Sequence, residues 1–279
     1  MLGTFGQIRA EDGFVAPSDL GLPAAPVDLP DLFKPVQERS EFTQYQWKRS
    51  IPTTVFWVGE LASPKNPVDN IASAWDGKWR TSFGGFDDPR RQNRVGYLPK
   101  GFVPTQNPFY IALPYNDITY TGTKSSAKTV VPWFDEVFYR KGRSVLKGRW
   151  LAIRYGNKIC YGQWEDVGPF TTDDHAYVFG DSRPRTKGNG GAGLDVSPAI
   201  RDYLGFRYNV KCDWRFVEVE DVPDGPWKKW GRNNPFANSQ GEDRTVSESL
   251  VMLHDLRDRL KGEEGEVSSA ANDAGDSPE

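Results

Sequence analysis

Apolar and polar positions alternate most clearly near the middle of the chain, in "GRWLAIRYGNKICYGQWEDV" at residues 148–167. Residues from Trp150 to Tyr155 fall alternately on the two sides of an extended chain. Gly156-Asn157 then interrupts the run, as in the tight turn of a β-hairpin. We therefore predict two antiparallel strands joined by this turn.

Shorter strand-like runs, bounded by turn residues, flank the hairpin. Strands are expected at 53–59, 80–89, 107–117, 193–196 and 212–220. A further run at 129–139 is compatible with a strand or a helix. One short helix is expected at 197–205, because Ser197 can cap it, Pro198 suits its first position and Gly205 can end it. The pattern predicts a mainly β domain.

The two ends of the chain lack this pattern. Residues 1–50 are rich in proline and indicate an extended arm or linker before a barrel domain at 51–222. A C-terminal extension at 223–262 contains leucines at helical spacing over 246–262, which predicts an amphipathic helix. Its apolar stripe would pack on the domain or, less commonly, bind a partner. Residues 263–279 form an acidic tail of the composition that is typical of disorder.

Composition supports a turn-rich β protein, with 28 Gly and 21 Pro in 279 residues. Aromatic residues make up 13% of the chain, either as core or as flat surfaces that stack on sugar rings. A net charge of -3 argues against general nucleic-acid binding. The basic clusters at 87–94 and 182–187 are typical of solvated loops. No apolar run is long enough to span a membrane.

The two cysteines, Cys160 and Cys212, each lie in a strand-like run. Neighbouring strands would allow a disulfide, and two buried free thiols are the alternative. A disulfide would indicate an oxidising compartment. The N-terminus has no signal-peptide core, so the chain is cytoplasmic or a mature secreted form, and the tryptophan-rich β composition favours an extracellular or periplasmic protein. With His175 and His254 far apart, no standard zinc site is expected, and no metal or cofactor is predicted.

Acidic residues follow several of the expected strands. They are Asp87, Asp88, Asp117, Asp166 and Asp195. Paired carboxylates are what glycoside cleavage needs, because one protonates the leaving oxygen while the other activates water or stabilises positive charge on the sugar. The simpler alternatives are that Asp166 accepts hydrogen bonds from turn amides and that Asp195 caps the helix that follows it.

Two motifs resemble the double-psi β-barrel of the rare-lipoprotein-A family, which expansins and family-45 endoglucanases share. The first is "WEDVGPF" at 164–170, and the second is "GLDVSPAIRDYLG" at 193–205. The matching residues are Asp166, Gly168, Pro169, Phe170, Asp195, Ser197, Leu204 and Gly205. More loosely, "SFGGFDD" at 82–88 and "ALPYND" at 112–117 resemble earlier parts of the same pattern.

The resemblance implies a closed six-stranded double-psi barrel over about 78–220, with Phe170 filling its interior. It implies that Asp195 is the catalytic acid of the lytic and hydrolytic relatives. The family's upstream histidine has no counterpart, since Phe109, Tyr110 and Ile111 stand there.

We therefore expect a secreted, monomeric protein that cleaves glycosidic bonds in peptidoglycan or β-glucan, as a glycoside hydrolase or lytic transglycosylase. The alternative is a non-catalytic, expansin-like protein that binds or loosens cell walls. Asp195 and Asp117 are the predicted catalytic residues. Substrate contacts are predicted at Tyr110, Tyr115, Asp87, Asp88, Asp166 and His175. A polysaccharide is the expected partner.

Overall fold

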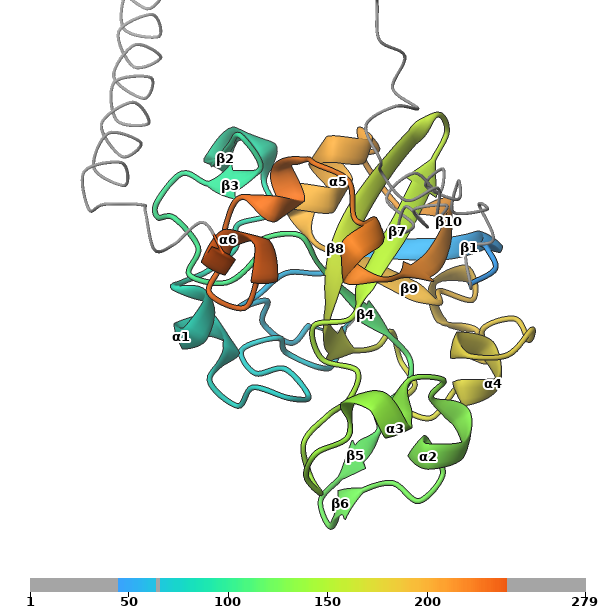
Figure 1. Ribbon diagram of the computed structural model, residues 1–279. Helices are drawn as coiled ribbons and strands as arrows, with labels where there is room; N and C mark the ends of the chain where they lie inside the picture. The colour runs from blue at the N-terminus through green and yellow to red at the C-terminus, as the bar shows by residue number, and fades with distance from the viewer. Residues whose placement is uncertain (1–44, 64–65, 240–279) are drawn as a thin grey trace, which may run out of the picture. The chain divides into compact units, whose positions relative to one another are not determined.

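A computed structural model of the protein describes residues 45–63 and 66–239 (Figure 1). These ranges cover the predicted barrel domain at 51–222 except for residues 64 and 65. The predicted helix at 246–262, the acidic tail and most of the predicted N-terminal arm lie outside the described residues.

Six strands form a closed barrel in the order β1-β10-β7-β8-β4-β9. They are β1 Lys48–Val55, β4 Tyr110–Leu113, β7 Trp150–Tyr155, β8 Lys158–Val167, β9 Leu194–Val196 and β10 Val210–Val217. The predicted six-stranded closed barrel is confirmed. Its first strand starts at Lys48, well before the predicted span of 78–220 and inside the predicted arm.

The pairing pattern has an internal symmetry. β1 runs parallel to β9 and β4 runs parallel to β8, whereas the other four pairs are antiparallel. If β1 is exchanged with β8, β4 with β9 and β7 with β10, the same set of strand pairs results. The barrel is thus assembled from two interlocked three-strand halves, and each parallel pair joins one half to the other.

Short elements complete the described part of the chain. Two small sheets pair β2 Arg94–Val95 with β3 Leu98–Pro99 and β5 Ile118–Thr119 with β6 Gly122–Thr123. The helices are α1 Trp79–Phe83, α2 Ala127–Val130, α3 Phe134–Val137, α4 His175–Val178, α5 Pro198–Leu204 and α6 Pro235–Ser239. Single 3-10 turns lie at η2 Arg91–Asn93, η3 Gly188–Gly190, η4 Val219–Asp221 and η5 Pro226–Lys228. Within the described ranges, none of the helices has the length and apolar character needed to cross a membrane.

The strand predicted at 80–89 is wrong, because its first residues form helix α1. Gly84 ends this helix with a φ of 101°, and its N–H returns to the carbonyl groups of the last turn. The ambiguous run at 129–139 is also largely helical, in α2 and α3. In both places a glycine or proline breaks a short helix that the local sequence does not distinguish from a strand.

The predicted hairpin and the predicted helix α5 are confirmed. Ser197 Oγ accepts a hydrogen bond from the Ile200 N–H at 3.3 Å, and Gly205 ends the helix at a φ of 88°. The helix packs closely on β8, because a Cβ on Gly162 would come within 2.8 Å of Ile200 Cδ1. Glycine at this position allows the helix to approach the barrel wall.

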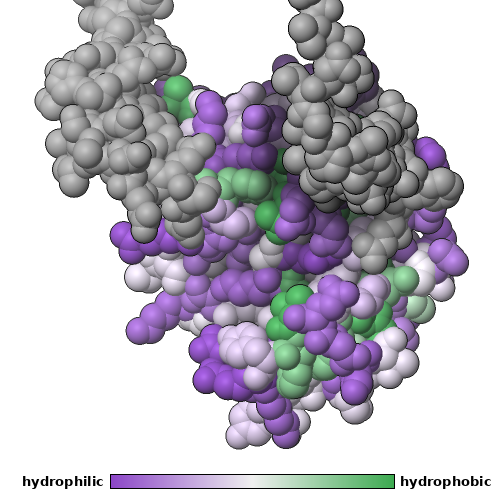
Figure 2. Space-filling model, viewed as in Figure 1, coloured by the Kyte–Doolittle hydropathy of each residue, from purple (hydrophilic) through white to green (hydrophobic). Residues whose placement is uncertain are grey.

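Aromatic side chains fill the barrel and one patch outside it. Trp150, Trp164 and Trp214 are fully buried in the main core. A second cluster packs against β1 and β4 and consists of Phe56, Val58, Trp79, Phe83, Tyr110 and Ala112. Much of the aromatic excess is therefore core. Among the described residues on the face in Figure 2, polar side chains predominate, with apolar ones gathered around α3, where Val137 and Phe138 are exposed.

The predicted disulfide is absent, and Cys160 and Cys212 are both buried free thiols. The prediction assumed that their strands are neighbours, but β7 lies between β8 and β10. Strands two places apart are separated by roughly 9–10 Å, beyond the reach of a disulfide. The argument from a disulfide to an oxidising compartment therefore loses its basis.

Phe170 is also placed differently from the expectation. It is 50% exposed rather than inside the barrel. Its ring lies against the chain at Gly188, where an added Cβ would come within 3.2 Å of it. The barrel interior is already filled by tryptophans such as Trp164 and Trp214, so it leaves no space for this ring.

Candidate functional site

Four residues from four neighbouring strands lie in one row across the barrel wall. The strand registers place Asp166 opposite Ala112, Ala112 opposite Asp195, and Asp195 opposite Thr54. Side chains at directly opposed positions project from the same face of a sheet. Asp166 and Asp195 therefore flank the small side chain of Ala112 on one face.

A bulge in β8 brings Asp166 into this row. Ile111 pairs with Trp164, but the next residue of β4, Ala112, pairs with Asp166, so that Glu165 is the extra residue. A bulge of this kind re-aims the side chains that follow it. Ile111 contributes to the barrel interior, whereas Ala112 belongs to the aromatic cluster outside it, so the acidic row lies on the outer face.

Asp195 is the centre of the site. Its Oδ1 accepts a hydrogen bond from Thr54 Oγ1, and its Oδ2 would lie 3.8 Å from a Cβ on Gly168. The two motifs that carry the family resemblance thus meet here. Burial, together with the negative charges of Glu60 and Asp166, raises the pKa of Asp195 to about 8. The residue as a whole is partly exposed, and with this pKa its carboxyl group is mostly protonated at neutral pH.

Glu60 is a functional candidate that the sequence analysis missed. It follows the segment after β1 and lies beside Gly59, whose φ is 82°. Asn70 Nδ2 donates to Glu60 Oε2 at 2.8 Å, and burial raises the pKa of this carboxyl group. The signal was present, because "TTVFWVGE" ends an expected strand with an acid as the other candidates do.

Asp166 lies deeper than Asp195. Only 7% of its surface is exposed, and the Ala74 N–H donates to its Oδ1 at 2.8 Å. Burial raises its pKa to about 6. It therefore accepts a loop amide, as the simpler interpretation of the sequence expected, and its charge also acts on Asp195.

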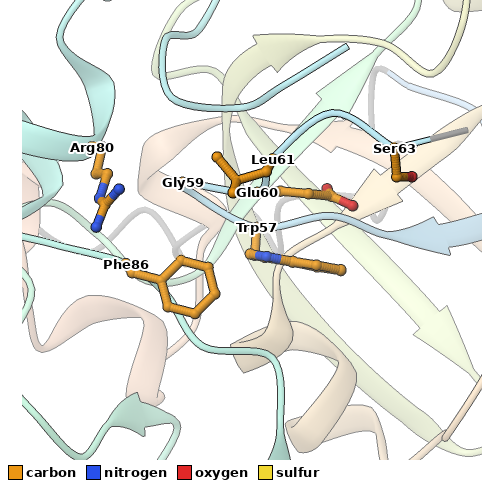
Figure 3. A pocket seen from close by; sticks show the side chains of 7 residues that line it. All are labelled: Trp57, Gly59, Glu60, Leu61, Ser63, Arg80 and Phe86. Carbon is orange, nitrogen blue, oxygen red and sulfur yellow. The ribbon is translucent and has the colours of Figure 1, made fainter. Parts of the chain in front are cut away.

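Glu60 also lines a pocket of about 450 Å³ (Figure 3). It is lined by Trp57, Gly59, Glu60, Leu61, Ser63, Arg80 and Phe86. Trp57 and Phe86 are half-buried aromatic residues, and Glu60 belongs both to the pocket and to the surroundings of Asp195. Size, aromatic lining and a few polar groups are the features of a small-molecule site.

Asp87 and Asp88 lie in a different environment. Asp87 is fully buried, forms an ion pair with Arg94 and accepts a hydrogen bond from the Tyr110 hydroxyl at 2.7 Å. Asp88 pairs with Arg90. These contacts hold the 87–94 segment in place, and the structure does not bring either acid into the row with Asp195.

The other predicted site residues also lie apart from this row. Asp117 is fully buried, and its two oxygens accept from Ser144 Oγ and the Val145 N–H, each at 2.7 Å. Tyr110 and Tyr115 are 1% exposed, so they pack in the interior rather than line a groove. His175 is exposed at the start of α4.

The alternative that Asp195 caps α5 is not what the structure shows. Ser197 occupies the cap position and accepts the Ile200 N–H, whereas the Asp195 carboxyl group faces Thr54. Within residues 45–63 and 66–239, no group of three or more His, Cys, Asp or Glu side chains could hold a metal ion. The raised pKa of Asp195 gives the site a carboxyl group that can donate a proton near neutral pH.

Comparisons of the chain with protein-family models, with curated proteins and with solved structures find no match.

Proposed function

We propose that this protein cleaves glycosidic bonds in a polysaccharide, with Asp195 as the general acid. The observation that carries the proposal is Asp195, whose pKa is raised to about 8 by burial and by the charges of Asp166 and of Glu60, a residue that lines an aromatic pocket. An acid that keeps its proton at neutral pH is what protonation of a leaving sugar oxygen requires.

The barrel supports the family resemblance on which this proposal builds. We propose that the barrel is a double-psi barrel, in which parallel strand pairs join two similar halves. The exchange symmetry of the strand pairings is consistent with this topology. The Asp166–Gly168 motif and the Asp195 motif lie together, as a shared site demands. We therefore propose a barrel of the rare-lipoprotein-A, expansin and family-45 endoglucanase type.

In the proposed reaction Asp195 is the acid, and Glu60, which lines the pocket, is the base. Asp195 donates its proton to the glycosidic oxygen, and the carbon–oxygen bond breaks with its electron pair going to that oxygen. Water forms the new bond to the sugar carbon, and Glu60 takes the proton that this water loses. Proton exchange with solvent then restores Asp195 and Glu60.

Asp166 and Thr54 act through Asp195. The negative charge of Asp166 favours the protonated form of its neighbour. The Thr54 hydroxyl holds the Asp195 carboxyl group in one orientation. Both are positioning residues, since Asp166 is too buried to meet a polymer.

The test is Asp195→Asn, assayed for release of reducing ends from β-glucans and peptidoglycan. Loss of the proton donor should lower turnover about 10²–10⁴-fold while glycan binding persists. Asp224→Asn is the matched control, because Asp224 is fully exposed and pairs only with Lys228. Turnover that is unchanged in Asp195→Asn would remove this residue from the mechanism.

A wild-type protein that binds these polymers without cleaving them would support the non-catalytic, expansin-like alternative instead. Both versions place the protein where wall polysaccharides are, and we propose an extracellular or periplasmic location. This location follows from the proposed substrate alone, because the cysteines give it no support.

A further inference from the structure

The pocket that Glu60 lines also contains Arg80, a cationic side chain that the proposed cleavage chemistry does not use. We propose that this pocket is a subsite for a sugar carrying a carboxylate, which pairs with the guanidinium of Arg80. The inference deepens the proposed function and rests on it, because it selects acidic glycans over neutral glucans as the substrate class.

Arg80 differs from three arginines near the barrel that are paired with acids. Arg94, Arg149 and Arg154 each form an ion pair with an acidic side chain. Among the residues that the structure describes, no acidic side chain pairs with Arg80, although it lines the same pocket as Glu60. Arg80 is exposed, and an arginine at a pocket can bind a carboxylate through two parallel hydrogen bonds.

Gly59 leaves room for the side chains of Arg80 and Phe86. A Cβ on Gly59 would come within 3.2 Å of Arg80 Cδ and 3.1 Å of Phe86 Cδ2. The φ of 82° also favours glycine at this position. A side chain at Gly59 would therefore displace both the Arg80 side chain and the Phe86 ring.

The opposite charges of Arg80 and Glu60 would orient a charged sugar in the pocket. Figure 3 shows Arg80 on one side of the opening and the Glu60 carboxylate on the other, with Trp57 and Phe86 between them. The aromatic faces can stack on the apolar face of a sugar ring. A sugar carboxylate would be repelled by Glu60 and attracted by Arg80, so it must point away from the catalytic acids. Its glycosidic bond is then directed toward Glu60 and Asp195.

Binding measurements on matched glycans test the inference. One pair is a β-1,4-glucan oligosaccharide and the same oligosaccharide oxidised at C6 to glucuronate. The other is a chitin oligosaccharide and a peptide-free glycan in which alternate sugars carry a lactyl ether carboxylate at C3. The pairs differ in where the carboxylate sits, so they distinguish the two sources of the shared group. Asp195→Asn protein is used throughout so that no ligand is cleaved.

We expect at least one carboxylated glycan to bind about 10-fold or more tightly than its neutral partner at low salt. Arg80→Gln should abolish that preference without weakening the neutral glycan, whereas Arg80→Lys should keep part of it. Arg207→Gln is the matched control, because Arg207 is exposed and outside the pocket lining. Gly59→Ala should weaken all four glycans by displacing Arg80 and Phe86.

Equal affinity for both members of each pair would overturn the inference. So would a preference that survives Arg80→Gln, or one that Arg207→Gln reduces equally. These outcomes are separate from the cleavage test. A protein that prefers carboxylated glycans but cleaves nothing contradicts the proposed function alone, and one that cleaves neutral glucans without any preference contradicts this inference alone.

Discussion

Two acidic regions of this protein use the same residue type in opposite ways. Around Asp87, burial raises the carboxyl pKa, but the Arg94 guanidinium opposes it, and Asp202 pairs with the same arginine. Around Asp195, the nearest charges are Glu60 and Asp166, and both raise its pKa further. None of these three acids forms an ion pair within the described residues. A buried acid beside a cation is thus held in an ion pair, whereas a buried acid beside other acids has its pKa raised further.

The largest effect is expected from removing Arg94, the cation that pairs with Asp87. Arg94→Met removes the cation and leaves Asp87 buried without its ion-pair partner, so the free energy of unfolding should fall by about 3–5 kcal/mol. Urea unfolding measures this loss. The double variant Asp87→Asn/Arg94→Met should recover part of it. A single-variant loss below about 1 kcal/mol would show that this ion pair contributes little to stability.

The pH dependence of the free energy of unfolding should report on the acids whose pKa values burial raises. Burial is the main cause that raises the pKa of Asp195 to about 8, of Glu165 to about 7 and of Asp166 to about 6. Between about pH 4 and 8, these three carboxyl groups therefore keep protons in the folded state that they have lost in the unfolded state. The free energy of unfolding should therefore fall as pH rises from about 4 to 8.

Asp195→Asn should reduce this dependence between pH 6 and 8 by up to about 1.4 kcal/mol per pH unit, because one pKa unit corresponds to that free energy. Asp224→Asn should retain the wild-type slope. Denaturant unfolding at a series of pH values gives both slopes. If the slopes of the two variants agree, Asp195 is already ionised in the folded protein.

The smallest effect is expected at the cap of α5. Ser197→Ala removes the acceptor of the Ile200 N–H and should lower the free energy of unfolding by about 1 kcal/mol. Ser197 is only two residues from Asp195, yet its hydroxyl has no part in the proposed proton transfer. Thermal unfolding should show the loss while turnover stays at the wild-type level, and a matching loss of turnover would connect the cap to the site.

Local signals explain what the sequence could predict. The hairpin around Gly156-Asn157 and the helix between Ser197 and Gly205 are determined by neighbouring residues, and both are confirmed. Asp195 was identified because it ends a strand within a recognisable motif. The same rule applied to the segment after Val55 would have found Glu60.

Non-local arrangement explains the errors. Whether Cys160 can meet Cys212 depends on the order of strands around the barrel, which no local pattern contains. Asp117 follows an expected strand, as Asp195 does. However, its carboxylate oxygens accept hydrogen bonds from Ser144 and Val145, which are far from it in the sequence. The bulge that turns Asp166 toward Ala112 is likewise visible only in the register of two parallel strands.

The central claim is that Asp195 keeps its proton at neutral pH, and a carboxyl titration tests it most directly. Carbon-13 NMR of aspartate carboxyl groups, with the Asp195 signal assigned by its loss in Asp195→Asn, should show a titration midpoint near pH 8. A midpoint near 4, the ordinary value for an aspartate side chain, would mean that the Asp195 carboxyl group is ionised at neutral pH, and would contradict its role as the acid.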